Sequence, residues 1–241
     1  TDADLGQNQI FMNQVPAPVP DRHRIISAAT TPQLDEFGGF PKLCPNGSGY
    51  SVLLGNNDGA GQAEGISYEF TIPTTANKYS ISYNYAIVIQ DPGHQDFEQP
   101  RMKIQLFNVS DNAELNCSSF SFVAGGGLPG FQTSPIIVGN SPVLYKDWSG
   151  NTINLDGLAG KTIRFSATTT DCIFEAHFGY AYLDIAAQCS SELSGAIFCA
   201  DDPFIDVVAP FGYQSYQWLN SNFSQVLGTS QTLHLDPPLL P

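Results

Sequence analysis

The sequence holds few charged residues, and basic residues are the scarcer kind. Charged residues make up 13% of the 241 positions, with Lys+Arg 9 against Asp+Glu 23, and the net charge is −14. Such a surface repels phosphate backbones and anionic membrane surfaces, so we expect no nucleic-acid partner. No apolar run reaches the ~18 residues that a spanning helix needs, so we expect no membrane span.

Sequence motifs for catalysis are also missing. The chain contains no G-x-S-x-G, no P-loop and no HExxH. Asp96 and Glu98 form a carboxylate pair, but their place beside residues 99–101 favours a salt-bridged or metal-bound loop over acid/base chemistry. His94 follows Asp-Pro-Gly and is more typical of a turn residue than of a catalytic base or a ligand. The same alternatives stay open for His177. We therefore predict a binding protein and not an enzyme.

The cysteines lack zinc-binding spacing, since the chain has no CxxC and its four histidines are scattered. Disulfide bonds in an oxidising compartment are the better interpretation. We expect pairs among Cys44, Cys117, Cys172 and Cys189, for which three connectivities stay open, with Cys199 left over. A Cys189–Cys199 bridge is the alternative.

Turn formers and aromatic residues are abundant, with Gly 22, Pro 17, Tyr 10 and Phe 16. This composition favours a β-sandwich or jelly roll. The most informative stretch is 176–185, which alternates strictly although neither of its faces is polar. Phe178, Tyr180 and Tyr182 share one face, and smaller apolar residues share the other. Because both faces need cover, we predict a strand in the middle of a sheet within a layered β structure.

The same patterns predict strands along most of the chain. Beyond a short strand at 24–26, they are expected at 50–54, 66–72, 79–89, 101–108, 113–123, 134–145, 161–168 and 177–185. The composition turns small and polar after 185, so we place a domain boundary there, between 1–188 and 189–241. The second part, with strands expected at 204–208, 214–219 and 231–235, resembles the start of an immunoglobulin-like sandwich. We expect this second domain to be truncated.

Three blocks resemble a known module: residues 49–56, residues 89–94 with 98–101, and residues 171–172 with 177–184. The module recurs in large repetitive surface proteins of Bacteroidetes, including SprB-type gliding adhesins exported by type IX secretion. Residues 209–218 are similar to the PKD/Ig-like repeats that follow it there. The resemblance implies a jelly roll of the galactose-binding or carbohydrate-binding-module type, secreted to the bacterial cell surface.

The resemblance also implies a structural calcium ion near the last strand, and Asp184 is the residue carried over for it. Two loops offer further oxygen ligands of the kind that Ca²⁺ prefers. Asp58 and Glu64 belong to the first loop, and Asp91 and Glu98 to the second. Turn-forming carboxylates are the alternative interpretation.

Three aromatic residues are candidate sugar-binding rings: Trp148, Tyr145 and Phe97. A flat apolar sugar face packs on such a ring while nearby polar groups bind its hydroxyls. The alternative for Trp148, which lies in a predicted turn, is that it closes one end of the sandwich.

We therefore predict a non-enzymatic module of a secreted cell-surface adhesin. It either binds extracellular polysaccharide or surface glycan, or spaces other modules of the same long chain. The alternative is a carbohydrate-binding module of a secreted polysaccharide-degrading enzyme. The flanking sequence of the full gene would separate the two.

Overall fold

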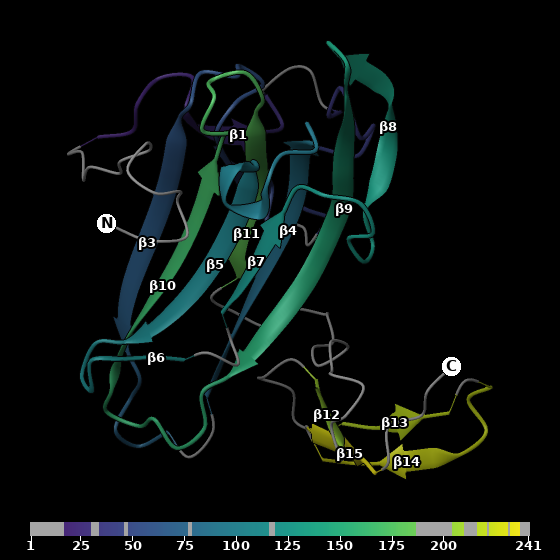
Figure 1. Ribbon diagram of the computed structural model, residues 1–241. Helices are drawn as coiled ribbons and strands as arrows, with labels where there is room; N and C mark the ends of the chain where they lie inside the picture. Colours follow the sequence, from purple (N-terminus) through teal and green to yellow (C-terminus); the bar gives the residue numbers. More distant parts are fainter. Residues whose placement is uncertain are drawn as a thin grey trace. The chain divides into compact units, whose positions relative to one another are not determined.

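The protein is a β structure, seen here in a computed structural model (Figure 1). The structure describes residues 17–29, 34–45, 48–76, 79–115, 119–186, 204–209, 216–220, 222–230 and 232–236. The described part of the chain holds no helix of the length and apolarity that a bilayer crossing requires.

The first sheet has six strands, and β11 lies between β2 and β4 inside it. In spatial order the strands are β1 (His23–Ser27), β2 (Tyr50–Leu54), β11 (Gly179–Ala186), β4 (Ser80–Gln90), β9 (Ser141–Asn154) and β8 (Gln132–Val138). The predicted mid-sheet position of the 176–185 stretch is therefore confirmed.

The second sheet lies in front of β11 and β4 in Figure 1. Its order is β3 (Ala63–Thr71), β10 (Thr162–Thr170), β5 (Arg101–Asn108) and β6 (Ala113–Glu114), with β7 (Phe120–Val123) also paired to β5. The chain crosses between the two sheets six times, after β2, β3, β4, β7, β9 and β10. This connectivity is that of a jelly roll, and it confirms the predicted fold class.

The inter-sheet core follows from the alternation within each strand. Phe165 of β10 lies opposite Leu106 of β5, and both are buried on the inner face of the second sheet. Tyr85 of β4 reaches across to this sheet, with its ring centroid 5.7 Å from that of Phe122. Burial raises the pKa of Tyr85 to about 12.

A second core covers the outer face of the first sheet. The side chains of Phe178, Tyr180 and Tyr182 pack there against Phe37 and Phe40 of the segment 34–45. The Phe37 and Phe178 ring centroids lie 5.2 Å apart, and the Phe40 and Tyr182 rings meet edge to face at 5.7 Å. This segment, called the cover below, is why β11 can be apolar on both faces.

Asp35 fixes the cover to β11. Its Oδ2 accepts hydrogen bonds from the hydroxyls of Tyr180 at 2.8 Å and Tyr182 at 3.0 Å. Its Oδ1 accepts from the backbone N–H of Phe37 at 3.0 Å and of Gly38 at 2.8 Å. Burial raises the pKa of both tyrosines, and the negative charge of Asp35 raises it further. The buried carboxylate is thus satisfied by four donors.

Two predicted strands are wrong in their extent. The expected strand 134–145 is divided between β8 and β9 by a turn at Gly139, whose φ of 62° a residue with a Cβ rarely adopts. The expected strand 113–123 is β6 followed by β7. Alternation of residue types continues through such short turns, so it does not show where one strand ends and the next begins.

The chain divides into two compact units. One consists of Thr1–Thr74, Tyr85–Ser149 and Gly160–Asp184, and the other of Thr75–Asn84, Gly150–Ala159 and Ile185–Pro241. Two strand pairs lie in the C-terminal part: β12 (Ile205–Val208) with β15 (Thr232–Leu235), and β13 (Trp218–Leu219) with β14 (Val226–Gly228). The predicted boundary at 188 lies outside the described residues, and the truncated immunoglobulin-like domain stays a prediction.

Candidate functional site

Three loops of the jelly roll meet and form a surface that we call the loop end. The backbone N–H of Ile173 donates to the carbonyl of Glu98 at 3.2 Å, and Asp171 accepts a hydrogen bond from Gln62. The loops are residues 55–62 between β2 and β3, residues 91–100 between β4 and β5, and residues 171–178 between β10 and β11. The loop end holds four of the eight candidate metal-binding and sugar-binding residues: Asp58, Asp91, Phe97 and Glu98.

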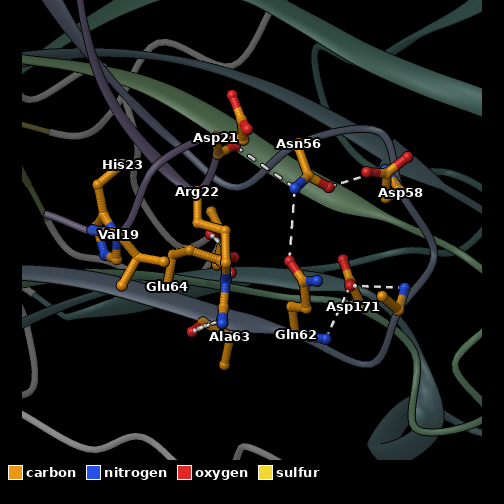
Figure 2. Close-up of polar contacts among 12 residues, drawn as sticks. Val19, Asp21, Arg22, His23, Asn56, Asp58, Gln62, Ala63, Glu64 and Asp171 are labelled. Atoms are coloured by element: carbon orange, nitrogen blue, oxygen red, sulfur yellow. Dashed lines mark hydrogen bonds and ion pairs between the residues drawn. The ribbon is translucent and has the colours of Figure 1, made fainter.

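Asp171 ties the first loop to the start of β11. Its Oδ2 accepts from the backbone N–H of Gln62 at 2.8 Å (Figure 2) and of Ala60 at 3.3 Å. Its Oδ1 accepts from the backbone N–H of Gly179 at 3.0 Å. Burial raises the pKa of Asp171 to about 7 against the effect of these donors, and the nearby charge of Glu64 also raises it. Asp171 therefore acts as a structural acceptor that holds two loops in one arrangement.

Glu64 at the beginning of β3 is 1% exposed and is paired with Arg22. The Arg22 Nε lies 2.5 Å from Glu64 Oε1, and its Nη2 donates to the carbonyl of Ala63 at 2.9 Å (Figure 2). Burial raises the pKa of Glu64, while the bond to Arg22 and its positive charge lower it. The guanidinium thus supplies the positive charge that the sequence analysis assigned to a calcium ion.

The other predicted calcium ligands lie apart. Asp184 accepts from the Ser48 hydroxyl at 2.6 Å near the beginning of β2, whereas Asp58 lies in the loop that follows the end of β2. Asp91 accepts from the side chain of Gln99 at 3.0 Å, and Glu98 accepts from the backbone N–H of Gln95 at 2.9 Å. Among the residues that the structure describes, no three of these carboxylates form one cluster. Calcium binding stays a prediction.

Two of the three predicted sugar-binding rings have a role in the second core. The indole N–H of Trp148 donates to the carbonyl of Pro41 in the cover at 2.6 Å, and the ring packs against the buried cluster. Tyr145 packs on the same cluster, and its hydroxyl donates to Gln132 at 3.0 Å. Phe97 is different, because it lies in the short helix η2 (Asp96–Glu98) at the loop end and is 52% exposed.

Phe174 is a further exposed ring that the sequence analysis missed. Phe174 is 55% exposed. It follows Ile173, whose backbone N–H donates to the carbonyl of Glu98, and Glu98 in turn follows Phe97. The Phe174 ring contacts His94 edge to face at 4.8 Å. The sequence did contain a signal for Phe174, because it is an aromatic residue in a turn between two predicted strands, where a side chain is not expected to be buried.

The structure describes only two of the five cysteines for which disulfide bonds were predicted. Cys44 and Cys172 are buried, and no disulfide bond joins them. Cys117, Cys189 and Cys199 lie outside the described residues. Because Cys172 is a free thiol, the predicted bridges that use it are wrong, whereas a Cys189–Cys199 bridge stays a prediction.

The fold and the loop end define a jelly-roll β-sandwich, and comparisons with known proteins add little to that class. No family model and no curated protein matches the chain. Two solved structures are similar: TmCBM61 in complex with β-1,4-galactotriose, and CBM27-1 of Caldicellulosiruptor saccharolyticus in complex with mannohexaose. The first is 10% identical over 67% of this chain and 83% of its own, and the second is 13% identical over 67% and 87%, each with a TM-score of 0.31. At this distance neither ligand carries over to this chain.

Proposed function

We propose that this chain is a non-catalytic, glycan-binding module of a secreted surface adhesin, and that it binds its ligand at the loop end. The observation that carries the proposal is the pair of exposed phenylalanine rings, Phe97 and Phe174, on two loops joined by a backbone hydrogen bond. Single exposed apolar residues are common on protein surfaces, but exposed rings on neighbouring loops are typical of a binding surface.

The surroundings of the rings suit a sugar. A pyranose has an apolar face that packs on an aromatic ring, and its hydroxyls need hydrogen-bond partners. Exposed polar side chains border both rings: Gln95 and Asp96 beside Phe97, and Glu175 beside Phe174. Carboxylates accept hydrogen bonds from sugar hydroxyls.

The charge of the chain narrows the ligand class. A net charge of −14 repels polyanions, and the polar side chains at the rings include two carboxylates. We therefore expect a neutral polysaccharide as ligand and weak or no binding to polyuronates. Weak binding by one module gains strength when modules repeat along an adhesin, as the resemblance implies for this chain.

The test is affinity electrophoresis in gels that contain neutral polysaccharides or a polyuronate. We expect at least one neutral polysaccharide to retard the chain, and Phe97→Ala and Phe174→Ala each to weaken binding about five- to tenfold, equivalent to roughly 1–1.4 kcal/mol. Phe223→Ala, which removes a ring that is 78% exposed in the other unit, is the matched control and should change nothing. Unchanged retardation of the Phe97→Ala/Phe174→Ala double variant would refute binding at the loop end.

A further inference from the structure

Three side chains with soft or borderline donor atoms converge at the loop end. The donor atoms of His94, Cys172 and His177 all lie within 4.8 Å of one another. The Cys172 Sγ lies 3.2 Å from His177 Nδ1, and the ring centroids of His94 and His177 are 5.2 Å apart at an interplanar angle of 79°. This is the only such group of three in the described part of the chain.

The backbone holds the three donors in place. The N–H of Cys172 donates to the carbonyl of His177 at 2.9 Å, which closes the 172–177 loop and brings its two ends together. His94 enters from the neighbouring loop, after a turn in which Gly93 donates to Asp91 Oδ1 at 3.0 Å. Ligands that come from two loops anchored by separate hydrogen bonds form a prearranged set.

One donor atom lacks a partner. His94 Nδ1 is buried and has no hydrogen bond to any described residue. A buried polar atom without a partner is destabilising, and in native proteins it calls for an explanation such as an ion. Cys172 is fully buried, so its thiol is shielded from solvent oxidants.

The donor set selects the kind of ion. One sulfur and two imidazole nitrogens favour zinc and similar divalent transition metals over calcium or magnesium, which prefer oxygen. Bonds of about 2.0–2.3 Å in a tetrahedral site put donor atoms roughly 3.3–3.8 Å apart. The sulfur and Nδ1 are already at 3.2 Å, so only His94 has to move closer, by about 1.5 Å at most.

We propose that His94, Cys172 and His177 bind one Zn²⁺-class ion, with water as the fourth ligand. Binding replaces the thiol proton by the metal, so one proton is released per ion and nothing is oxidised or reduced. The ion would join the loop that carries Phe97 to the loop that carries Phe174. The site is independent of glycan binding, because it needs no sugar and its test measures the metal alone.

The test uses the intact chain, reduced, stripped with EDTA and then titrated with Co²⁺ and with Zn²⁺ against a chromophoric chelator. We expect one ion per chain, a thiolate-to-cobalt charge-transfer band that Zn²⁺ abolishes, and a higher unfolding temperature with Zn²⁺. Cys172→Ser should remove the band, and His94→Gln should weaken Zn²⁺ binding by at least tenfold while the chain stays folded, since His94 is only half-buried.

Two control variants separate this site from other donors in the chain. Cys44→Ser removes a buried cysteine outside the cluster, and His234→Gln removes an exposed histidine paired with Asp206. Both should bind Zn²⁺ as tightly as the parent chain. The proposal is wrong if the intact chain shows no cobalt–thiolate band, if the band survives Cys172→Ser, or if His94→Gln binds Zn²⁺ unchanged.

Discussion

Replacing Asp35 should reveal how strongly the cover is fixed to β11. Asp35→Ala removes the acceptor of two buried tyrosine hydroxyls and of two backbone N–H groups. Each buried group left without a partner costs about 1–3 kcal/mol, although the backbone groups gain some access to water. We expect the free energy of unfolding to fall by about 3–5 kcal/mol, a large fraction of the ~5–15 kcal/mol typical of a domain.

Asp35→Asn is the matched control variant. Its amide oxygen accepts from the backbone N–H groups as Asp35 Oδ1 does, and its NH₂ can donate to the hydroxyl oxygens of Tyr180 and Tyr182. We therefore expect a loss of only about 1–2 kcal/mol, because the charge is removed but few groups are left unpaired.

Urea unfolding, followed by far-UV circular dichroism and tryptophan fluorescence, measures these losses. Trp148 contacts the cover through Pro41, so its emission reports directly on the segment. In the Tyr180→Phe/Tyr182→Phe background, Asp35→Ala should cost about 1–3 kcal/mol less than in the parent. Full additivity in this cycle, or a loss below about 1 kcal/mol for Asp35→Ala alone, would refute the role of Asp35.

Three more perturbations test other parts of the structure. Gly179→Ala should lower the free energy of unfolding by about 1–3 kcal/mol, because a Cβ there would lie 2.7 Å from the carbonyl oxygen of Thr170. In the control Gly126→Ala the new Cβ meets no atom within 4 Å, so this variant should leave stability unchanged in the same thermal unfolding assay. Because the pKa of Asp171 is raised to about 7, the folded chain keeps a proton that the unfolded chain loses above about pH 4. The free energy of unfolding should therefore fall as pH rises from about 4 to 7, by up to ~1.4 kcal/mol per pH unit, and Asp171→Asn should lose this part of the slope; an identical slope in both proteins would contradict the assignment. If calcium binds at Asp184 as predicted, millimolar Ca²⁺ added after EDTA should raise the unfolding temperature of the parent chain but not of Asp184→Ala, and an equal shift in both would exclude that residue as a ligand.

Alternation of residue types along the chain predicted much of the fold. The strand 101–108 was predicted with its observed bounds, and the apolar alternation around Tyr180 placed β11 inside a sheet with both faces covered. These features are local, because the direction of a side chain in a strand depends only on its position. The same periodicity missed the turn at Gly139, since alternation alone continues across it.

The sites depend on contacts between residues distant in sequence. Arg22 and Glu64 are 42 residues apart and Asp35 and Tyr180 are 145 apart, so no spacing rule pairs them. The sequence analysis dismissed zinc because the cysteines and histidines are scattered. The chain reversal between β10 and β11 and the hydrogen bond from Ile173 to Glu98 bring the loops of Cys172 and His94 together.

The sequence by itself thus determined the positions of most strands and the two-sided burial of β11, because both follow from residue type and alternation within one strand. The tertiary structure decided which groups meet: that Arg22 neutralises Glu64, that Trp148 closes the second core, and that Phe97 stays exposed. The physical reason is that charge compensation, burial and metal coordination act over a few ångströms in space, and only the packed jelly roll sets those distances.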